Sequence, residues 1–476
     1  MSDGRPSADH PGASGSEPGG TCPGRPGAGS HTPGQPGPGD PRASLLGLAA
    51  NWRQFGLFTI ITALIGMTIG VERVALPPLA EHSFGITSVL YTVSFISAFG
   101  AVKSVMNLVS GRLSDRRGRK GILLAGWAFA VPYALIIIFA DAWWQVIVAN
   151  LFLGVNQALT WTMSVTAKID LVGPLNRGLA VGVDESAGYV GVGLGGFAAG
   201  LLVSSYGLRP APYLLALAVV AVGVLVTAGA ARETVHLARS EAAAGTARRG
   251  PSPPAPAKQA PSLGRLATYM SWHDRSMLAV CQAGFLNKFA DSLVAAFFPL
   301  YLARRGVPLA QIGLLVGVYA WVWGLGQVAA GALADRIGRK TPITLGTFLL
   351  AGGLSLFAAG EHAGWWIGAA LMGTGMALAY PNLITTVGDV ADPRWRGGAL
   401  GVYRLWRDGG YAVGPLVLGA VAALAGLDAA IWTGAALLAL SGTVLVVLFA
   451  ETDPRRRRRP PVWEARPDWV APGPGR

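Results

Sequence analysis

Charged residues are scarce in this sequence. Asp, Glu, Lys and Arg make up 13% of its 476 residues, whereas hydrophobic residues make up 52%. About a quarter of the residues of a soluble globular protein are charged, so this composition indicates an integral membrane protein. Cysteine is scarcer still, because Cys22 and Cys281 are the only two. A disulfide framework and a cysteine-based metal site are therefore excluded.

Patterns that would support enzymatic chemistry are also missing. The sequence offers no nucleophile with a paired base, no cluster of His and carboxylate residues and no phosphate-binding loop. We therefore expect no enzyme, no cofactor, no metal and no ATP-driven transport. A sensor would be expected to carry an added signalling domain, for which the tails are too short. The net charge of +13 does not predict a nucleic-acid partner, because the basic residues are spread over short loops and the tail.

Long apolar segments fill most of the chain. A membrane-spanning helix needs about 20 mostly apolar residues. Twelve segments fit, at roughly 54–79, 88–110, 120–140, 143–166, 178–204, 211–231, 277–302, 310–333, 341–359, 364–388, 397–425 and 428–449. We predict an all-α membrane protein with five parts: a disordered N-terminal tail (1–50), a six-helix bundle (51–231), a cytoplasmic linker (232–276), a second six-helix bundle (277–450) and a basic cytoplasmic tail (451–476).

Basic residues in the short loops predict the orientation, because Lys and Arg favour the cytoplasmic side. With the N-terminus inside, the external loops hold only Arg209, Arg304 and Arg305. The internal loops hold Arg112, Arg116, Arg117, Arg119, Lys120, Arg177, Arg336, Arg339, Lys340, Arg394 and Arg396. We expect a monomer in the inner cell membrane with both termini in the cytoplasm.

The sequence contains an internal repeat. Residues 111–120 read GRLSDRRGRK and residues 331–340 read GALADRIGRK, an offset of 220 residues. A second set follows at an offset of 219, where Asp170, Pro174, Arg177, Gly178 and Gly182 recur as Asp389, Pro393, Arg396, Gly397 and Gly401. The two halves are therefore copies of one six-helix unit. Such repeats are typical of transporters whose solute site lies between the halves, near the membrane midplane.

The repeated loop strongly resembles the signature loop of the major facilitator superfamily, over about residues 54–450. A weaker likeness to the G-P-x-x-G-G motif of bacterial drug/proton antiporters lies in GVGLGG (191–196), where Val192 replaces Pro, and in GPLVLG (414–419). Asn150 departs from that branch, which has an Arg associated with proton coupling at the matching position. The resemblance implies a twelve-helix fold and secondary transport by alternating access.

The resemblance also implies that the repeated loop latches the cytoplasmic side. Physically, a carboxylate at a helix end can pair with Arg or with the N-terminus of a helix from the other half. The alternative is that these basic residues only set the topology. We assign the latch to Gly111, Asp115, Arg116, Gly118, Arg119, Asp335, Arg336 and Arg339.

Charged residues inside spans are expensive in lipid and normally face a cavity or a partner. Counted from the inner end of the seventh span, Lys288 lies ~17 Å and Asp291 ~21 Å deep, near the middle of a core ~30 Å thick. The cavity candidates of this kind are Glu72, Arg73, Lys103, Glu185, Lys288, Asp291, Arg404, Arg407 and Asp408, and Asp184 lies beside Glu185. The alternatives are structural ion pairs and, for Lys103, snorkelling to the surface.

Polar and aromatic residues at mid-span complete the predicted cavity. They are Asn156, Gln157, Trp161, Tyr319, Trp323, Gln327 and Tyr380, for which ordinary helix packing is the alternative. Glu72, Glu185, Asp291 and Asp408 are candidate proton carriers, because a cavity carboxylate can exchange a proton for solute. We predict proton-coupled efflux of a small drug-like or metabolite solute. The alternative is a transporter of a charged, anionic metabolite, for uptake or export.

Overall fold

The computed structural model describes residues 46–86, 89–247 and 261–457. Twelve long helices lie in this part of the chain and overlap the twelve predicted spans. They are α1 (Leu48–Phe84), α2 (Val89–Arg117), α3 (Arg119–Ile138), α4 (Trp143–Val172), α5 (Arg177–Tyr206), α6 (Ala211–Ala230), α9 (Arg275–Arg304), α10 (Leu309–Ile337), α11 (Lys340–Ala359), α12 (His362–Val390), α13 (Arg396–Ala425) and α14 (Leu427–Leu448). The predicted all-α membrane fold is confirmed.

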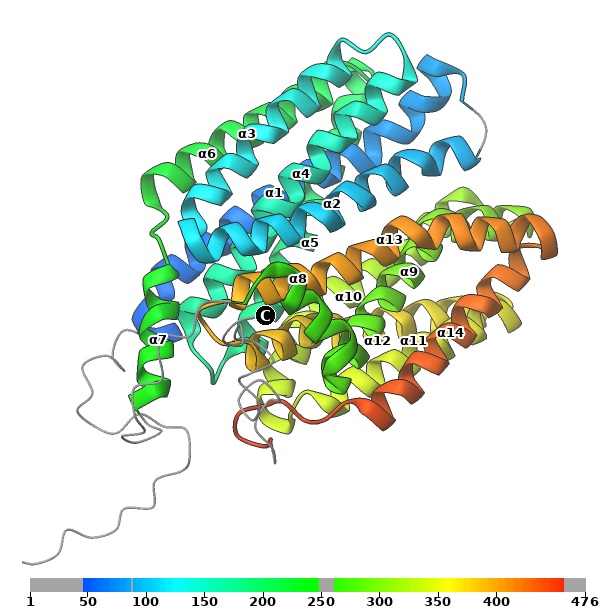
Figure 1. The fold of residues 1–476 in the computed structure, drawn as a ribbon. Helices are drawn as coiled ribbons and strands as arrows, with labels where there is room; N and C mark the ends of the chain where they lie inside the picture. Colours follow the sequence, from blue (N-terminus) through cyan, green and yellow to red (C-terminus); the bar gives the residue numbers. More distant parts are fainter. Residues whose placement is uncertain (1–45, 87–88, 248–260, 458–476) are drawn as a thin grey trace, which may run out of the picture.

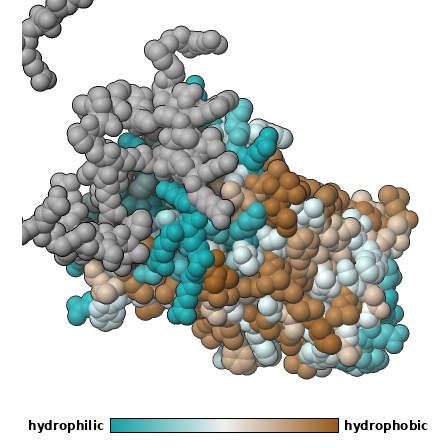
Figure 2. Space-filling model, turned by 90° about the horizontal axis from the view of Figure 1, so that it is seen from below, coloured by the Kyte–Doolittle hydropathy of each residue, from teal (hydrophilic) through white to brown (hydrophobic). Residues whose placement is uncertain are grey.

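Apolar composition explains why these segments can lie in a membrane. Among the described residues, ten helices are long and apolar enough to cross one; α2 and α9 are the two long helices that fall short. Both carry polar residues that turn inward, such as the buried Asn107 of α2 and Asp291 of α9. On the outside, Figure 2 shows apolar residues covering the middle of the visible face, between hydrophilic residues toward the two ends.

The twelve helices gather in two bundles (Figure 1), with α1–α6 in one and α9–α14 in the other. The bundles touch along α2 and α13 and along α5, α10 and α12. Glycines allow this close approach. A Cβ atom at Gly111 would lie 2.0 Å from the backbone oxygen of Gly397, and one at Gly331 would lie 2.1 Å from that of Gly178. The two contacts are copies of each other, as the repeat requires.

The predicted linker contains structure that the sequence analysis did not include. A helix, α7 (Val235–Ala247), follows the first bundle, and α8 (Leu263–Thr268) leads through a π-helical turn (Tyr269–His273) into α9. Helix α1 begins at Leu48, inside the predicted N-terminal tail. Residues 1–45 of that tail, the middle of the linker (248–260) and most of the C-terminal tail (458–476) lie outside the described residues.

Candidate functional site

Two carboxylates join the bundles at one end of the molecule, which we call the latch end because it carries loops 111–120 and 331–340. Asp115, near the end of α2, accepts hydrogen bonds from the backbone N–H groups of Gly397 (3.0 Å) and Gly398 (2.7 Å) in the first turn of α13. A helix N-terminus favours a carboxylate, because its N–H groups are unpaired and its dipole is positive there. Asp115, which belongs to the first bundle, therefore binds the second bundle.

The second copy of the motif repeats this contact in the opposite direction. Asp335, near the end of α10, accepts hydrogen bonds from the backbone N–H groups of Gly178 (2.9 Å) and Leu179 (2.8 Å) at the start of α5. Here the carboxylate belongs to the second bundle and the helix to the first. Opening the latch end would therefore break both contacts.

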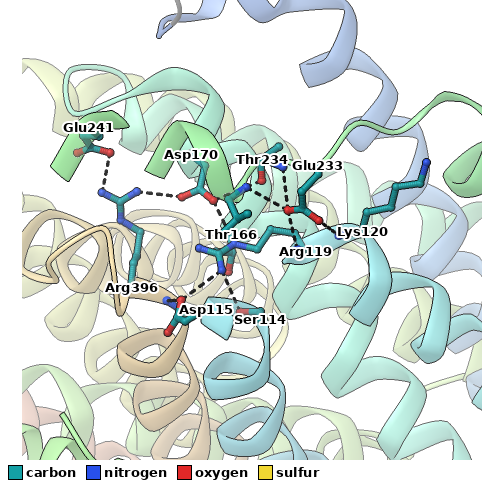
Figure 3. Close-up of polar contacts among 12 residues, drawn as sticks. Ser114, Asp115, Arg119, Lys120, Thr166, Asp170, Glu233, Thr234, Glu241 and Arg396 are labelled. Carbon is teal, nitrogen blue, oxygen red and sulfur yellow. Dashed lines mark hydrogen bonds and ion pairs between the residues drawn. The ribbon is translucent and has the colours of Figure 1, made fainter. Parts of the chain in front are cut away.

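Buried arginines connect these carboxylates to the ends of α4 and α12. Arg119 forms ion pairs with Asp115 (3.2 Å) and Asp170 (3.1 Å), and Arg396 reaches Asp170 from the other bundle at 3.0 Å. Figure 3 shows Arg119 and Arg396 both directed at Asp170. The second copy has the corresponding ion pairs: Arg339 with Asp335 and Asp389 at 2.8 Å, and Arg177 with Asp389 at 3.3 Å.

Glu241 of α7 bridges the two copies of the motif. Its carboxylate forms ion pairs with Arg396 (2.8 Å) and with Arg177, which occupy matching positions in the two halves. Burial would raise the pKa of Glu241, but the guanidinium groups of Arg177 and Arg396 hold this pKa below its usual value. Glu241 thus stays ionised at neutral pH. The sequence analysis missed it, because nothing in the linker pattern marks one glutamate.

Glu233, just before α7, supports the turn at Gly118. It accepts hydrogen bonds from the backbone N–H groups of Arg119 (2.8 Å) and Lys120 (3.1 Å). Although burial opposes it, these backbone bonds lower the pKa of Glu233. Gly118 has a φ of 92°, and a Cβ there would lie 2.3 Å from the Glu233 carboxylate. In the second half Glu451 binds the N–H groups of Arg339 and Lys340 beside Gly338 in the same way.

Two residues assigned to the latch lie outside these contacts. The side chains of Arg116 and Arg336 are exposed at the latch end. Among the described residues they form no ion pair across the bundles, although the carbonyl oxygen of Arg336 accepts a hydrogen bond from Arg456 (2.7 Å). Their place is the one expected of basic residues that set topology.

A cavity lies between the bundles. It is farther from the latch end than the contacts described above. It contains about 510 Å³ of empty space, open solvent included. Seven of the predicted cavity residues line it: Arg73, Lys103, Trp161, Lys288, Tyr380, Arg407 and Asp408. The rest of the wall consists of Ile69, Phe99, Gly100, Tyr189, Val192 and Tyr411. Cationic and aromatic side chains thus dominate the wall.

Two of the cations in the wall have carboxylate partners. Lys288 forms an ion pair with Asp291 (2.9 Å), which lies behind the wall and also accepts a hydrogen bond from Tyr319 (3.0 Å). Arg407 forms an ion pair with Asp408 (2.8 Å) and donates a hydrogen bond to Tyr380 (3.1 Å). Each pair belongs to the second bundle.

The other two cations belong to the first bundle and have no ion-pair partner among the described residues. Arg73 on α1 is exposed to the cavity. The ammonium group of Lys103 on α2 lies over the rings of Phe99 (5.3 Å) and Trp161 (5.5 Å). Lys103 therefore points inward, and snorkelling to the membrane surface does not describe its position.

A sequence profile described as Major Facilitator Superfamily matches residues 58–283 and 280–473. The chain belongs to the major facilitator superfamily. It is therefore a multi-pass membrane transporter and not an enzyme, and members of this superfamily carry small-molecule solutes. Among the described residues, no group of three or more His, Cys, Asp or Glu side chains could hold a metal ion.

Relatives of this superfamily member include the multidrug resistance protein MdtG of Escherichia fergusonii, 24% identical over 435 residues that cover 87% of this chain and 98% of that protein. MdtG of Proteus mirabilis is 26% identical over 364 residues, which cover 74% and 83%. Two solved structures share the fold. The human organic anion transporter MFSD10 has a TM-score of 0.65 at 19% identity, covering 85% and 100%, and the proton:xylose symporter XylE has a TM-score of 0.66 at 13% identity, covering 85% and 98%.

Several predicted cavity residues of this major facilitator lie behind the wall instead. Asn156 binds the carbonyl oxygen of Gly126 (2.8 Å), and Gln157 binds Thr68 (3.0 Å), both inside the first bundle. Glu72 is buried beside Arg73 without lining the cavity. Three buried residues of α10 also lie outside the wall: Tyr319, Trp323 and Gln327.

Glu185 and Arg404 form a separate contact between the bundles. They pair at 3.3 Å, both fully buried, and Glu185 also accepts a hydrogen bond from Trp161 (3.1 Å). Trp161 lines the cavity whereas the other two do not. This pair therefore lies just beneath the cavity wall.

The sequence analysis missed two tyrosines of the wall. Tyr189 accepts a hydrogen bond from Lys288 (3.0 Å) across the bundles, and its ring packs against Trp323 at a tilt of 48°, with ring centroids 4.0 Å apart. Tyr411 lies under the Lys288 ammonium group at 5.8 Å. Helical spacing could have found Tyr411, because it follows Arg407 and Asp408 by four and three residues on the same face.

Proposed function

We propose that this transporter exports a small drug-like solute across the inner cell membrane by alternating access, in exchange for protons. The observation that carries the proposal is a cavity with charged walls between two bundles, which breakable polar contacts hold together at the latch end. The MdtG relatives, named as multidrug resistance proteins, support a drug-like solute. Export requires the cavity to load from the cytoplasm, so the latch end must open there.

We further propose that the latch end faces the cytoplasm, with both chain termini and α7 on that side. The basic residues of the internal loops support this orientation. The conformation described here is then outward-open, and the cavity exchanges with the outside. The two bundles, residues 51–231 and 277–450, would rock as units, and a single chain would be the functional unit.

Asp291 and Asp408 are proposed proton carriers of the cavity. Each is bonded to a cation in the wall, Lys288 or Arg407, so a proton on the carboxylate would release that cation toward the solute. Each exchanged proton supports about tenfold accumulation of solute per unit of pH gradient, because one pH unit is worth about 1.4 kcal/mol.

We expect Asp408→Asn or Asp291→Asn to lower the accumulation ratio about tenfold per pH unit. The measurement is steady-state uptake into inside-out vesicles with an imposed pH gradient, using a solute that a growth-inhibition screen of an expressing strain identifies. Asp428→Asn is the control, because Asp428 is an exposed carboxylate paired with Arg305 away from the cavity. If both variants keep the accumulation ratio of the wild type, these two carboxylates are not carriers. If the wild-type protein itself shows an accumulation ratio of one, the proposed proton exchange is rejected.

One observation favours the second candidate, a transporter of organic anions. The five cations in and just behind the wall are Arg73, Lys103, Lys288, Arg404 and Arg407, and they outnumber the four carboxylates there, which are Glu72, Glu185, Asp291 and Asp408. An unpaired cation in a low-dielectric site is costly and attracts an anion. Aromatic rings beside it would suit the apolar part of such a solute.

Matched dansyl compounds test the charge of the solute. If the anion is preferred, the purified protein binds dansyl sulfonate more tightly than neutral dansylamide or cationic dansylcadaverine. Arg73→Gln should then weaken binding of the sulfonate about tenfold and leave dansylamide unchanged, while Arg73→Lys should keep most of the affinity. Preference for the cationic compound would reject the anion candidate and leave export intact.

A further inference from the structure

A second charged pair lies outside the solute cavity, inside the first bundle. Lys168 of α4 and Asp184 of α5 form an ion pair of 2.9 Å, and both side chains are fully buried. Thr62 of α1 and Ser164 of α4 donate hydrogen bonds to the same carboxylate oxygen, Oδ1, at 2.8 and 3.1 Å. Neither charged residue lines the cavity. The latch contacts do not use this pair.

The shared fold does not require this pair. At the repeat offset of 219, Lys168 corresponds to Val387 and Asp184 to Tyr403. The second bundle therefore packs the same two helix positions, on α12 and α13, with residues that carry no charge at neutral pH. A buried ion pair generally contributes no more stability than apolar residues of similar volume. Its presence in one half only indicates a role other than folding.

One oxygen of the Asp184 carboxylate is free to accept a proton. Asp184 Oδ2 is buried and has no hydrogen-bond partner among the described residues, whereas Oδ1 is bonded to Thr62, Ser164 and Lys168. The other charged group that acts on Lys168 is Glu185, next to Asp184 on α5. Glu185 is itself paired with Arg404 of the second bundle at 3.3 Å. On α1 the groups that face the pair are uncharged: Thr62, and the ring of Phe55 at 5.5 Å from Lys168 Nζ.

Helix α5 connects this pair to two contacts between the bundles, the one with Asp335 and the one between Glu185 and Arg404. Its N-terminus is capped by Asp335, and Glu185 is next in sequence to Asp184. Asp184 lies about 10 Å from the start of α5. A change in the charge of Asp184 therefore acts on the helix that the latch holds and on the residue that pairs with Arg404.

We propose that Lys168 and Asp184 form a proton-binding site of this transporter that is separate from the solute cavity. Asp184 takes up one proton at Oδ2, which makes the carboxyl neutral and breaks its ion pair with Lys168. The same proton leaves when the ion pair forms again. This inference rests on the proposed exchange with protons, and it adds one proton to those carried by the cavity carboxylates.

The test replaces the pair by apolar residues of similar size, Lys168→Met together with Asp184→Leu. The accumulation ratio in inside-out vesicles should fall about tenfold per unit of imposed pH gradient relative to the wild type. Solute exchange without a gradient should continue. The endpoint ratio is the deciding readout, because a variant that only packs badly reaches the wild-type ratio more slowly but does not change it.

Three further variants sharpen the result. Asp184→Glu should keep the wild-type ratio, and Asp184→Asn should lower it like the double variant. Adding Asp408→Asn to the double variant should lower the ratio further if both sites carry protons. A wild-type ratio in Lys168→Met/Asp184→Leu would overturn the inference alone. If the double variant does not fold, Asp184→Asn decides by the same endpoint. If the wild-type protein itself shows an accumulation ratio of one, the proposed proton exchange is rejected instead.

Discussion

Replacing Asp115 with Asn is expected to slow transport about thirtyfold while the amount of protein in the membrane stays at the wild-type level. The variant keeps the shape of the side chain but loses its charge, and with it the ion pair to Arg119 and the strength of two bonds to the start of α13. Hydrogen bonds to a charged group contribute about 1.5–3 kcal/mol. A loss of about 2 kcal/mol from the closed latch end shifts its equilibrium roughly thirtyfold.

The repeat supplies a matched second variant. Asp335→Asn should slow transport to a similar extent, because Asp335 makes the same two backbone contacts to α5. Asp141→Asn is the control, since Asp141 is exposed in the connection between α3 and α4. Initial rates of solute uptake in proteoliposomes, normalised to incorporated protein, measure all three. Wild-type rates for Asp115→Asn would mean that this carboxylate does not hold the bundles.

The fold was predictable because its signals are long and repeated. Twelve mostly apolar runs are each about as long as a membrane core is thick, and no soluble fold competes for them. The contacts at the latch end were predictable for a different reason. A carboxylate, a glycine and several basic residues recur in two copies, and a helix end with free N–H groups is the natural partner of such a carboxylate. Asp115 and Asp335 meet the expected kind of partner.

The cavity was only partly predictable, because sequence gives the depth of a residue in the membrane but not the direction it faces. Asn156 and Trp161 point about 140° apart on α4, and only Trp161 reaches the cavity. The rotation of α4 is fixed by its packing against α3, α2 and α1. Glu72 and Arg73 are adjacent, so they point about 100° apart and only one faces the cavity.

Other contacts gave no signal in the sequence. Glu241 binds Arg177 and Arg396 only because α7 folds back against the latch end, and its segment lacks the composition of a spanning helix. Lys168 lies near the predicted end of the fourth span, where a lysine normally reaches the membrane surface. Its burial depends on Asp184 of the neighbouring helix. Contacts of this kind are decided by three-dimensional packing between distant segments.

The glycines at helix crossings give the other large expected effect. Gly111→Ala should prevent the latch end from closing, because its Cβ would lie 2.0 Å from the backbone oxygen of Gly397 in the other bundle. A backbone atom cannot yield as a flexible side chain can. The first bundle itself is untouched by this clash, so the protein should still fold and insert. We expect transport to fall at least tenfold and the latch end to stay open.

Distances between nitroxide labels at the exposed positions Arg116 and Arg336, measured by double electron–electron resonance after Cys22 and Cys281 are replaced, report the latch end directly. Gly111→Ala should shift the distribution toward longer distances. Gly121→Ala is the control, because a Cβ at Gly121 meets nothing within 4 Å. An unchanged distribution with normal transport would show that the crossing of α2 and α13 does not limit closure.

A clash of the same size inside one bundle should have a different outcome. A Cβ at Gly191 of α5 would lie 2.0 Å from the backbone oxygen of Ala63 on α1, and both helices belong to the first bundle. Helices in lipid associate through such small-residue contacts, so Gly191→Ala should lower the yield of folded protein instead of opening the latch end. If Gly111→Ala and Gly191→Ala both abolished folding, the bundles would not be separable units. The expected contrast follows because a contact between moving bodies can be lost without unfolding either, whereas a contact within one body cannot.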